Sequence, residues 1–220
     1  MLRYIFLALL AVVSIIHLID SWNDATKKRP RTKWALLPLI IAYYLASTQS
    51  PSWVLIAALV TSWIGDVLLI PQGTAWFAAG GLSFLTAHVF FVCLYVPQVV
   101  FSAVNWFIVV PVALVYIAVT TTILVLLKKN TPKMMFIPMF LYLLINSTMN
   151  IFALMQLISN PCAGSVVAYI GAALFFISDC SLYLNKYYEK PIVFKKHFTI
   201  MLTYILGELL ITQGMLMLGL

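Results

Sequence analysis

Three carboxylates lie within long apolar stretches of this 220-residue sequence, where a charged side chain is costly. Asp66 stands in SWIGDVLLI, Asp179 in FFISDCSLYL and Glu208 in TYILGELLI. An ionised group near the middle of a membrane helix costs roughly 2.5–3.5 kcal/mol on insertion scales. Ionisable groups in such places mark function by default, and two carboxylates in different surroundings can divide the roles of acid and base. Asp66 and Asp179 are therefore the candidate catalytic residues.

Further polar and aromatic side chains recur at helical spacing in these stretches. Tyr142, Asn146 and Asn150 are four residues apart and share one helix face, and Tyr204 and Glu208 repeat the spacing. Such stripes also form hydrogen bonds between membrane helices, which is their structural alternative. The candidate substrate-binding residues are His88, Tyr142, Asn146, Asn150, Tyr183, Tyr204, Glu208, Phe84, Phe175 and Lys33.

The apolar stretches themselves predict an all-α polytopic membrane protein. Hydrophobic residues make up 64% of the chain and charged residues only 9%, whereas a soluble domain carries about 25% charged residues. We expect a single transmembrane domain over residues 1–220 with about eight transmembrane helices, of which the second is short. The expected segments are 2–20, 34–48, 52–71, 76–96, 105–127, 135–158, 163–186 and 197–219.

The basic residues predict the orientation of these helices. With eight helices, twelve of the thirteen Lys and Arg residues fall in or beside the connections after the first, third, fifth and seventh, leaving only Arg3 on the other side. The positive-inside rule then makes both termini non-cytoplasmic. The net charge of +7 is therefore explained by the orientation of the helices in the membrane. The expected partners are membrane lipids and not nucleic acid.

The two aspartates stand in similar surroundings. SWIGDVLLI and FFISDCSLYL each place a small residue before an Asp, in the third helix of each four-helix half, so a parallel four-helix repeat is possible. Asp66 lies five residues before Pro71, and Asp179 lies seven before Lys186. Both carboxylates are therefore expected at one depth, roughly 7–10 Å inside the cytoplasmic helix ends.

Several blocks resemble the lysoplasmalogenase family of eight-helix membrane hydrolases. SWIGDVLLI resembles the family's Ser-x-x-Gly-Asp-x-x-Leu block, and GAALFFISDCSLYLNKY resembles its Gly-x-x-x-Phe-x-x-Ser-Asp block. FAAGGLSFLTAHVFF is similar to its Gly-x-x-x-Phe-x-x-x-His segment, while LYLLINSTMNIFAL and TYILGELLITQG stand where the sixth and eighth helices should. The resemblance implies hydrolysis of the vinyl ether bond of lysoplasmalogens to a fatty aldehyde and glycerophosphoethanolamine or glycerophosphocholine.

This reaction suits two carboxylates, because vinyl ethers resist nucleophiles but are cleaved by acid. It needs one protonated acid, one group that activates water, and no cofactor; the sequence has no Gly-x-Ser-x-Gly nucleophile motif. Which aspartate donates the proton stays open at this point. We expect the headgroup near Lys33, Lys128 or Lys186, and the alkenyl tail among Phe84, Phe91 and Phe175.

Other functions remain possible from the sequence. A proton-coupled transporter of a lipid or small metabolite would use the acids as relays, and a lipid-binding scaffold would use them only for helix packing. Asp66, His88, Asp179 and Glu208 are metal-capable types, but they show no ligand spacing. The protein is expected to be a multi-pass membrane protein, in the plasma or inner membrane if bacterial and in the endoplasmic reticulum if eukaryotic.

Overall fold

The computed structural model describes all 220 residues and contains eight α-helices and no strands. Two short 3-10 turns, Val96–Gln98 and Phe101–Ala103, connect the fourth and fifth helices. The all-α prediction is confirmed, and every helix end lies within four residues of its expected position. The helices are α1 (Leu2–Trp22), α2 (Pro30–Leu45), α3 (Trp53–Leu68), α4 (Thr74–Tyr95), α5 (Trp106–Leu127), α6 (Lys133–Ser159), α7 (Ala163–Tyr187) and α8 (Lys196–Met217).

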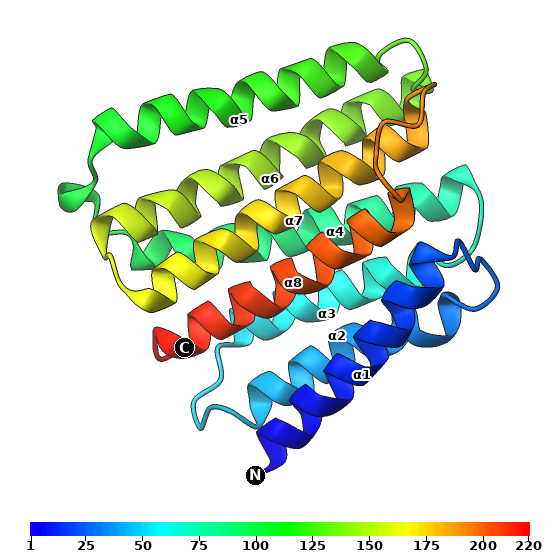
Figure 1. The fold of residues 1–220 in the computed structure, drawn as a ribbon. Coiled ribbons are helices and arrows are strands. Elements are labelled where there is room, and N and C mark those ends of the chain that lie inside the picture. The colour runs from blue at the N-terminus through cyan, green and yellow to red at the C-terminus, as the bar shows by residue number, and fades with distance from the viewer.

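Successive helices run antiparallel, so their connections alternate between the two ends of the bundle. The α1–α2, α3–α4, α5–α6 and α7–α8 connections gather at the right of Figure 1, and both termini lie at the other end. This is the alternation that the basic residues predict. We call the end with these four connections the basic end; its cytoplasmic location stays a prediction of the charge rule.

Helix length supports a multi-pass membrane protein. Six helices of 21 to 27 residues are long and apolar enough to cross a bilayer. The other two, α2 and α3, have 16 residues each and extend only about 24 Å at 1.5 Å per residue. α2 begins at Pro30, earlier than expected, because proline is well suited to the first helical position.

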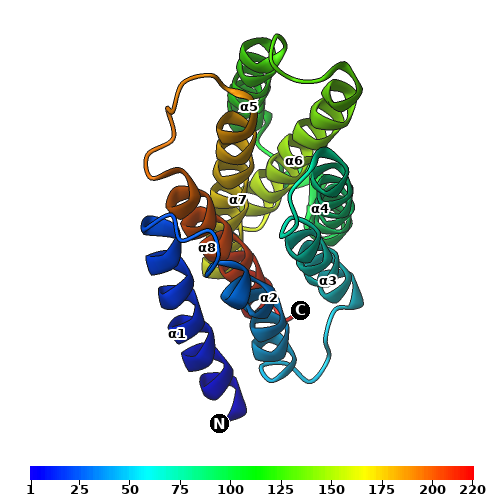
Figure 2. The ribbon, with the colours of Figure 1, turned by 90° about the vertical axis from the view of Figure 1, so that its right-hand side faces the viewer.

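The helices at the two edges of the bundle are the most exposed. Figure 2 shows α1 and α5 on opposite sides, with α7 and α8 between them. Large apolar side chains of α1 and α5, including Ile15, Ile19, Val115 and Val125, are exposed. In a membrane protein, such surfaces face the lipid chains.

Glycines allow α7 and α8 to approach until their backbones touch. A Cβ added to Gly171 would lie 2.6 Å from the backbone nitrogen of Ile211, and one added to Gly214 would lie 2.5 Å from that of Ala168. Small residues at such contacts are a common way of packing membrane helices. α7–α8 and α3–α4 make the two most extensive helix contacts, and α4 packs on α6 as α8 packs on α2, which agrees with the possible repeat.

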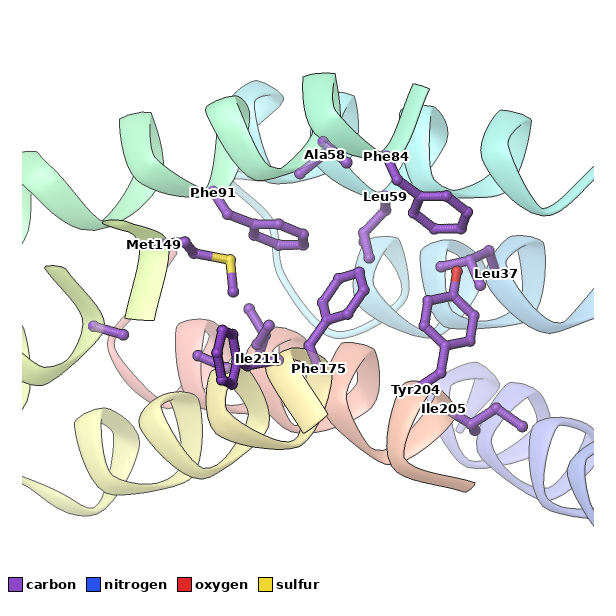
Figure 3. Close-up of a cluster of buried hydrophobic side chains, with 14 of the residues drawn as sticks. Leu37, Ala58, Leu59, Phe84, Phe91, Met149, Phe175, Tyr204, Ile205 and Ile211 are labelled. Atoms are coloured by element: carbon purple, nitrogen blue, oxygen red, sulfur yellow. The ribbon is translucent and has the colours of Figure 1, made fainter. Parts of the chain in front are cut away.

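Aromatic side chains fill the space between α4, α7 and α8. The rings of Phe84, Phe175 and Tyr204 meet edge to face, with centroids 5.4–6.4 Å apart. Figure 3 shows Phe175 between Phe91 and Tyr204, with the Tyr204 hydroxyl directed toward α2. Since edge-to-face pairs fix ring orientation, this cluster holds the Tyr204 side chain in place.

Gly171→Ala should destabilise the protein by about 1–3 kcal/mol, because the new methyl group clashes with the backbone of α8. Gly81→Ala is the matched control, since its added Cβ would meet only the Tyr183 hydroxyl oxygen, at 4.0 Å. Melting of the purified proteins in detergent compares the two. Equal melting temperatures for Gly171→Ala and the wild type would contradict the close backbone contact.

Candidate functional site

A cavity of about 580 Å³ lies at the basic end of the bundle. Its 22 lining residues come from α1, α2, α3, α4, α7, α8 and the connections between them, and none comes from α5 or α6. Asp66 and Asp179 both line it, although 113 positions of chain separate them. The fold thus brings the two candidate catalytic residues to one cavity.

Asp66 is held between a cation and a hydroxyl donor. Lys33 Nζ lies 3.2 Å from Asp66 Oδ1, and the Tyr204 hydroxyl donates a hydrogen bond of 2.7 Å to Oδ2. Asp66 is only 2% exposed, and Lys33 reaches it from the first turns of α2. Both partners donate to this carboxyl group, so they stabilise its ionised form.

Asp179 has different partners. Asn146 Nδ2 donates a hydrogen bond of 2.7 Å to Asp179 Oδ2, and His88 Nε2 lies 3.3 Å from the same oxygen. The other ring nitrogen of His88, Nδ1, lies 2.7 Å from the backbone oxygen of Phe84. A backbone oxygen only accepts, so Nδ1 carries a hydrogen and Nε2 is the nitrogen that can exchange a proton with Asp179.

A directed chain of hydrogen bonds ends on Asp179. The Tyr116 hydroxyl donates to Asn150 Oδ1, Asn150 Nδ2 donates to Asn146 Oδ1, and Asn146 Nδ2 donates to Asp179. The distances are 3.2, 3.0 and 2.7 Å, and the chain crosses from α5 through α6 to α7. Hydrogen bonds that point in one direction polarise one another, so Asn146 is both oriented and strengthened as a donor.

The small residue before each aspartate has its own structural role. A Cβ on Gly65 would lie 2.6 Å from the Phe84 ring, so glycine allows α4 to pack closely beside Asp66. Ser178, before Asp179, donates a hydrogen bond of 2.9 Å to the backbone oxygen of Ile200 and so connects α7 to α8. The Gly-Asp and Ser-Asp pairs are therefore parts of the packing that places the carboxylates.

The depths of the two aspartates differ from the sequence estimate. α3 ends at Leu68, before Pro71, so Asp66 lies in its last turn, whereas Asp179 lies eight residues before the end of α7. The estimate used Pro71 as the helix end, but residues 69–73 form the α3–α4 connection. The carboxylates reach the same cavity because α7 continues further at this end than α3 does.

The other candidate residues divide into three groups. Lys33, Phe84 and Tyr204 line the cavity with the two aspartates. His88 and Asn146 contact Asp179 from behind, and the Tyr142 ring lies 5.2 Å from His88 and 5.4 Å from Tyr183. The remaining three candidates do not line the cavity. Asn150 donates to Asn146 and so lies one hydrogen bond further from Asp179, and Phe175 is fully buried in the core. Glu208 is also fully buried, and its carboxyl oxygens have no hydrogen-bond partner.

Only some of the residues expected near the headgroup and the tail line the cavity, and where a lipid lies stays a prediction. Lys186 lines the cavity with Lys33 and Phe84, but Lys128, Phe91 and Phe175 do not. Lys128 follows α5, which contributes nothing to the cavity. The rings of Phe91 and Phe175 are fully buried in the core. The apolar part of the lining comes instead from residues on both sides of the cavity, namely Leu69, Ile70, Phe77, Leu182, Ile200 and Met201.

Several polar lining residues are not among the candidates that the sequence indicates. His17, Arg29, Gln72, Asn185 and His197 all line the cavity. From the sequence, Arg29 is only one of the twelve basic residues that predict the orientation of the helices. The signal that could have found them is their position: each lies at or near a helix end that belongs to the basic end. No group of three or more His, Cys, Asp or Glu side chains is arranged to hold a metal ion.

Fold and site together define a multi-pass all-helical membrane protein with a polar cavity at one end that contains two carboxylates. Comparison with known families identifies it further: the model of the YhhN family matches residues 28–215, and the chain belongs to this family. The match covers α2 to α7 and most of α8 but not α1. No match was found among curated proteins or among solved structures.

Lys33→Met should destabilise the protein by on the order of 3 kcal/mol, because it leaves the Asp66 carboxylate buried without its cation. Combining it with Asp66→Asn removes both charges and should recover much of this loss. Melting in detergent of the two single variants and the double variant gives the coupling energy. Strictly additive effects would mean that the ion pair does not contribute to the fold.

Proposed function

We propose that this protein is a membrane hydrolase that cleaves the vinyl ether bond of lysoplasmalogens by acid–base catalysis. The observation that carries the proposal is that two buried carboxylates line one cavity and have different partners, a lysine and a tyrosine at Asp66 and a histidine and an asparagine at Asp179. The YhhN family includes lysoplasmalogenases, which supports the same activity. The products are a fatty aldehyde and a glycerophospho-ethanolamine or -choline.

The reaction begins with protonation of carbon. A proton added to the β-carbon of the vinyl ether leaves an oxocarbenium ion, which water then attacks to form a hemiacetal. The hemiacetal breaks its bond to the glycerol oxygen and releases the aldehyde. The site therefore needs a proton donor and a carboxylate that stabilises the cation and accepts a proton from water.

Asp66 fits the role of the carboxylate. Lys33 and Tyr204 both stabilise its ionised form, and its negative charge would stabilise a positively charged oxocarbenium ion in the same cavity. It can take a proton from the attacking water and return this proton to the glycerol oxygen as the carbon–oxygen bond breaks.

Asp179 with His88 fits the role of the proton donor. With Nδ1 bonded to the Phe84 backbone oxygen, Nε2 is the ring nitrogen that faces Asp179 Oδ2, 3.3 Å away, so a proton can pass between the two groups. This pair gives the proton to the β-carbon and regains one from the hemiacetal hydroxyl. The proton count balances, since one water and one vinyl ether give one aldehyde and one alcohol.

The cavity contains no alternative nucleophile in an activating arrangement. Ser178 is the one serine that lines it, and its hydroxyl donates to the Ile200 backbone and not to a histidine. The transporter alternative is less well supported, because α3 and α7, which carry the aspartates, are continuous helices. A transporter would also move its lipid chemically unchanged.

Asp66→Asn and Asp179→Asn should each reduce aldehyde release from alkenyl lysophospholipid by about 10²-fold or more, because each removes a proton-transfer step. The purified protein is assayed in detergent micelles, with aldehyde measured by mass spectrometry. Glu189→Gln is the control, since Glu189 is exposed and does not line the cavity. Wild-type turnover in either Asp variant would contradict its assigned role.

Hydrolysis in D₂O should place one deuterium on the carbon next to the aldehyde carbonyl, because the first step adds a solvent-derived hydrogen there. Mass spectrometry of the aldehyde, trapped by reduction as it forms, measures this label. Unlabelled aldehyde kept in the same buffer controls for exchange. Aldehyde formed without the label would exclude protonation of the β-carbon.

A further inference from the structure

The cavity lining carries more positive than negative charge, and we call the part formed by Arg29 and Lys186, which unlike the two aspartates are not buried, the outer cavity. Arg29, Lys33 and Lys186 line it, and of these only Lys33 forms an ion pair with a carboxylate. Lys186 Nζ instead lies 4.9 Å from the centre of the Phe77 ring. Arg29 and Lys186 therefore form no ion pair within 4 Å in the protein.

Arg29 is the most clearly incomplete of these side chains. Its Nε atom is buried and has no hydrogen-bond partner, although a guanidinium group has five N–H donors. Partial burial lowers the pKa of Arg29 below its usual value, and the Asp24 carboxylate opposes this effect. Arg29 and Lys33 both lie close enough to His17 and His197 to act on them electrostatically, so these basic groups form one cluster.

The acidic groups that line the cavity are already paired. Asp66 pairs with Lys33, Asp179 with His88, and Asp24, which does not line the cavity, lies 3.6 Å from His197. An unpaired donor-rich guanidinium beside a lysine suits a phosphate oxygen, which Arg binds through two parallel hydrogen bonds.

No group in the lining is suited to the amine of a phospholipid headgroup. Alkylammonium groups are bound by carboxylates or by several aromatic faces. The lining carboxylates are Asp66 and Asp179, which are paired, and the lining aromatics are Phe77, Phe84 and Tyr204. Phe77 contacts Lys186, and the other two pack on each other and on Phe175.

We propose that the outer cavity is a phosphate subsite in which Arg29 is the principal ligand, assisted by Lys186, and that the headgroup amine is not recognised. The inference rests on the proposed function in taking the ligand to be a single-chain ether phospholipid. It predicts a protein that binds choline and ethanolamine forms equally and requires the phosphate.

Saturated ether lipids test this subsite without turnover, because they lack the acid-labile double bond. The probes are 1-O-hexadecyl-glycero-3-phosphocholine, the corresponding phosphoethanolamine and the phosphate-free 1-O-hexadecylglycerol, titrated into purified protein in micelles. We expect Kd values within about three-fold for the two phospholipids and at least ten-fold weaker binding of the alkylglycerol. Inorganic phosphate and glycerophosphocholine should compete only at millimolar concentrations.

Arg29→Gln should weaken both phospholipids about ten-fold and leave the alkylglycerol unchanged, whereas Arg29→Lys, which keeps the charge but loses the fork, should lie between. Arg31→Gln is the matched control, since Arg31 is exposed and does not line the cavity. Unchanged melting temperatures exclude misfolding as the cause, and Arg29→Lys carries the test if Arg29→Gln fails to fold.

Three results would overturn the subsite. These are alkylglycerol binding as tight as phospholipid binding, wild-type affinities in a folded Arg29 variant, or a ten-fold difference between choline and ethanolamine forms. Competition by micromolar inorganic phosphate would assign the cluster to a soluble phosphate ester and reject the lipid headgroup. The expected binding pattern without aldehyde release would support the subsite and reject the proposed hydrolase, so the two failures are distinguishable.

Discussion

A carboxyl group inside a membrane protein must have partners, and this requirement organises the bundle. Asp66 on α3 is bonded by Lys33 from α2 and Tyr204 from α8. Asp179 on α7 is contacted by His88 from α4 and Asn146 from α6, and the chain through Asn150 extends to Tyr116 on α5. Seven of the eight helices thus meet around two acids, and α1 reaches the same cavity through His17. Since unsatisfied polar groups in lipid cost several kcal/mol, these contacts bind helices that hydrophobic burial alone would leave loosely specified.

Close backbone packing makes this arrangement rigid. Glycines at the α7–α8 contact fix the distance between Asp179 and Tyr204, because their helices cannot approach further or rotate without collision. The edge-to-face cluster of Phe84, Phe175 and Tyr204 (Figure 3) then fixes the two rings of the cluster that line the cavity, Phe84 and Tyr204. The two carboxylates and the side chains that contact them therefore all lie on helices, which suits the precise geometry that proton transfer requires.

The sequence was sufficient for the architecture and for the two aspartates. Hydropathy and the alternation of basic residues are properties of single segments, so they located eight helices and their directions without tertiary information. Which helices become neighbours, in contrast, depends on the whole fold and cannot be read from a single segment. Tyr142, Asn146 and Asn150 look equivalent as one stripe, yet Asn146 donates directly to Asp179 while Asn150 donates to Asn146, because the two asparagines lie one helical turn apart along α6. In the sequence, Arg29 does not differ from the other basic residues of its connection, and only the fold shows that it lines the cavity. The end of α3 was misplaced because Leu69 and Ile70 are apolar but belong to a connection.

The shortness of α2 and α3 has a consequence for where the chemistry takes place. Both helices have 16 residues, and the cavity lies where α2 starts and α3 stops. Because both helices are shorter than the other six, the lining there includes the connections before α2 and after α3, which bring Arg29 and Gln72 to the cavity. Under the proposed function, a single-chain lipid would meet these polar groups with the carbons next to its headgroup while its chain stays among the lipid chains. Water would then reach the reacting bond without the lipid leaving the leaflet.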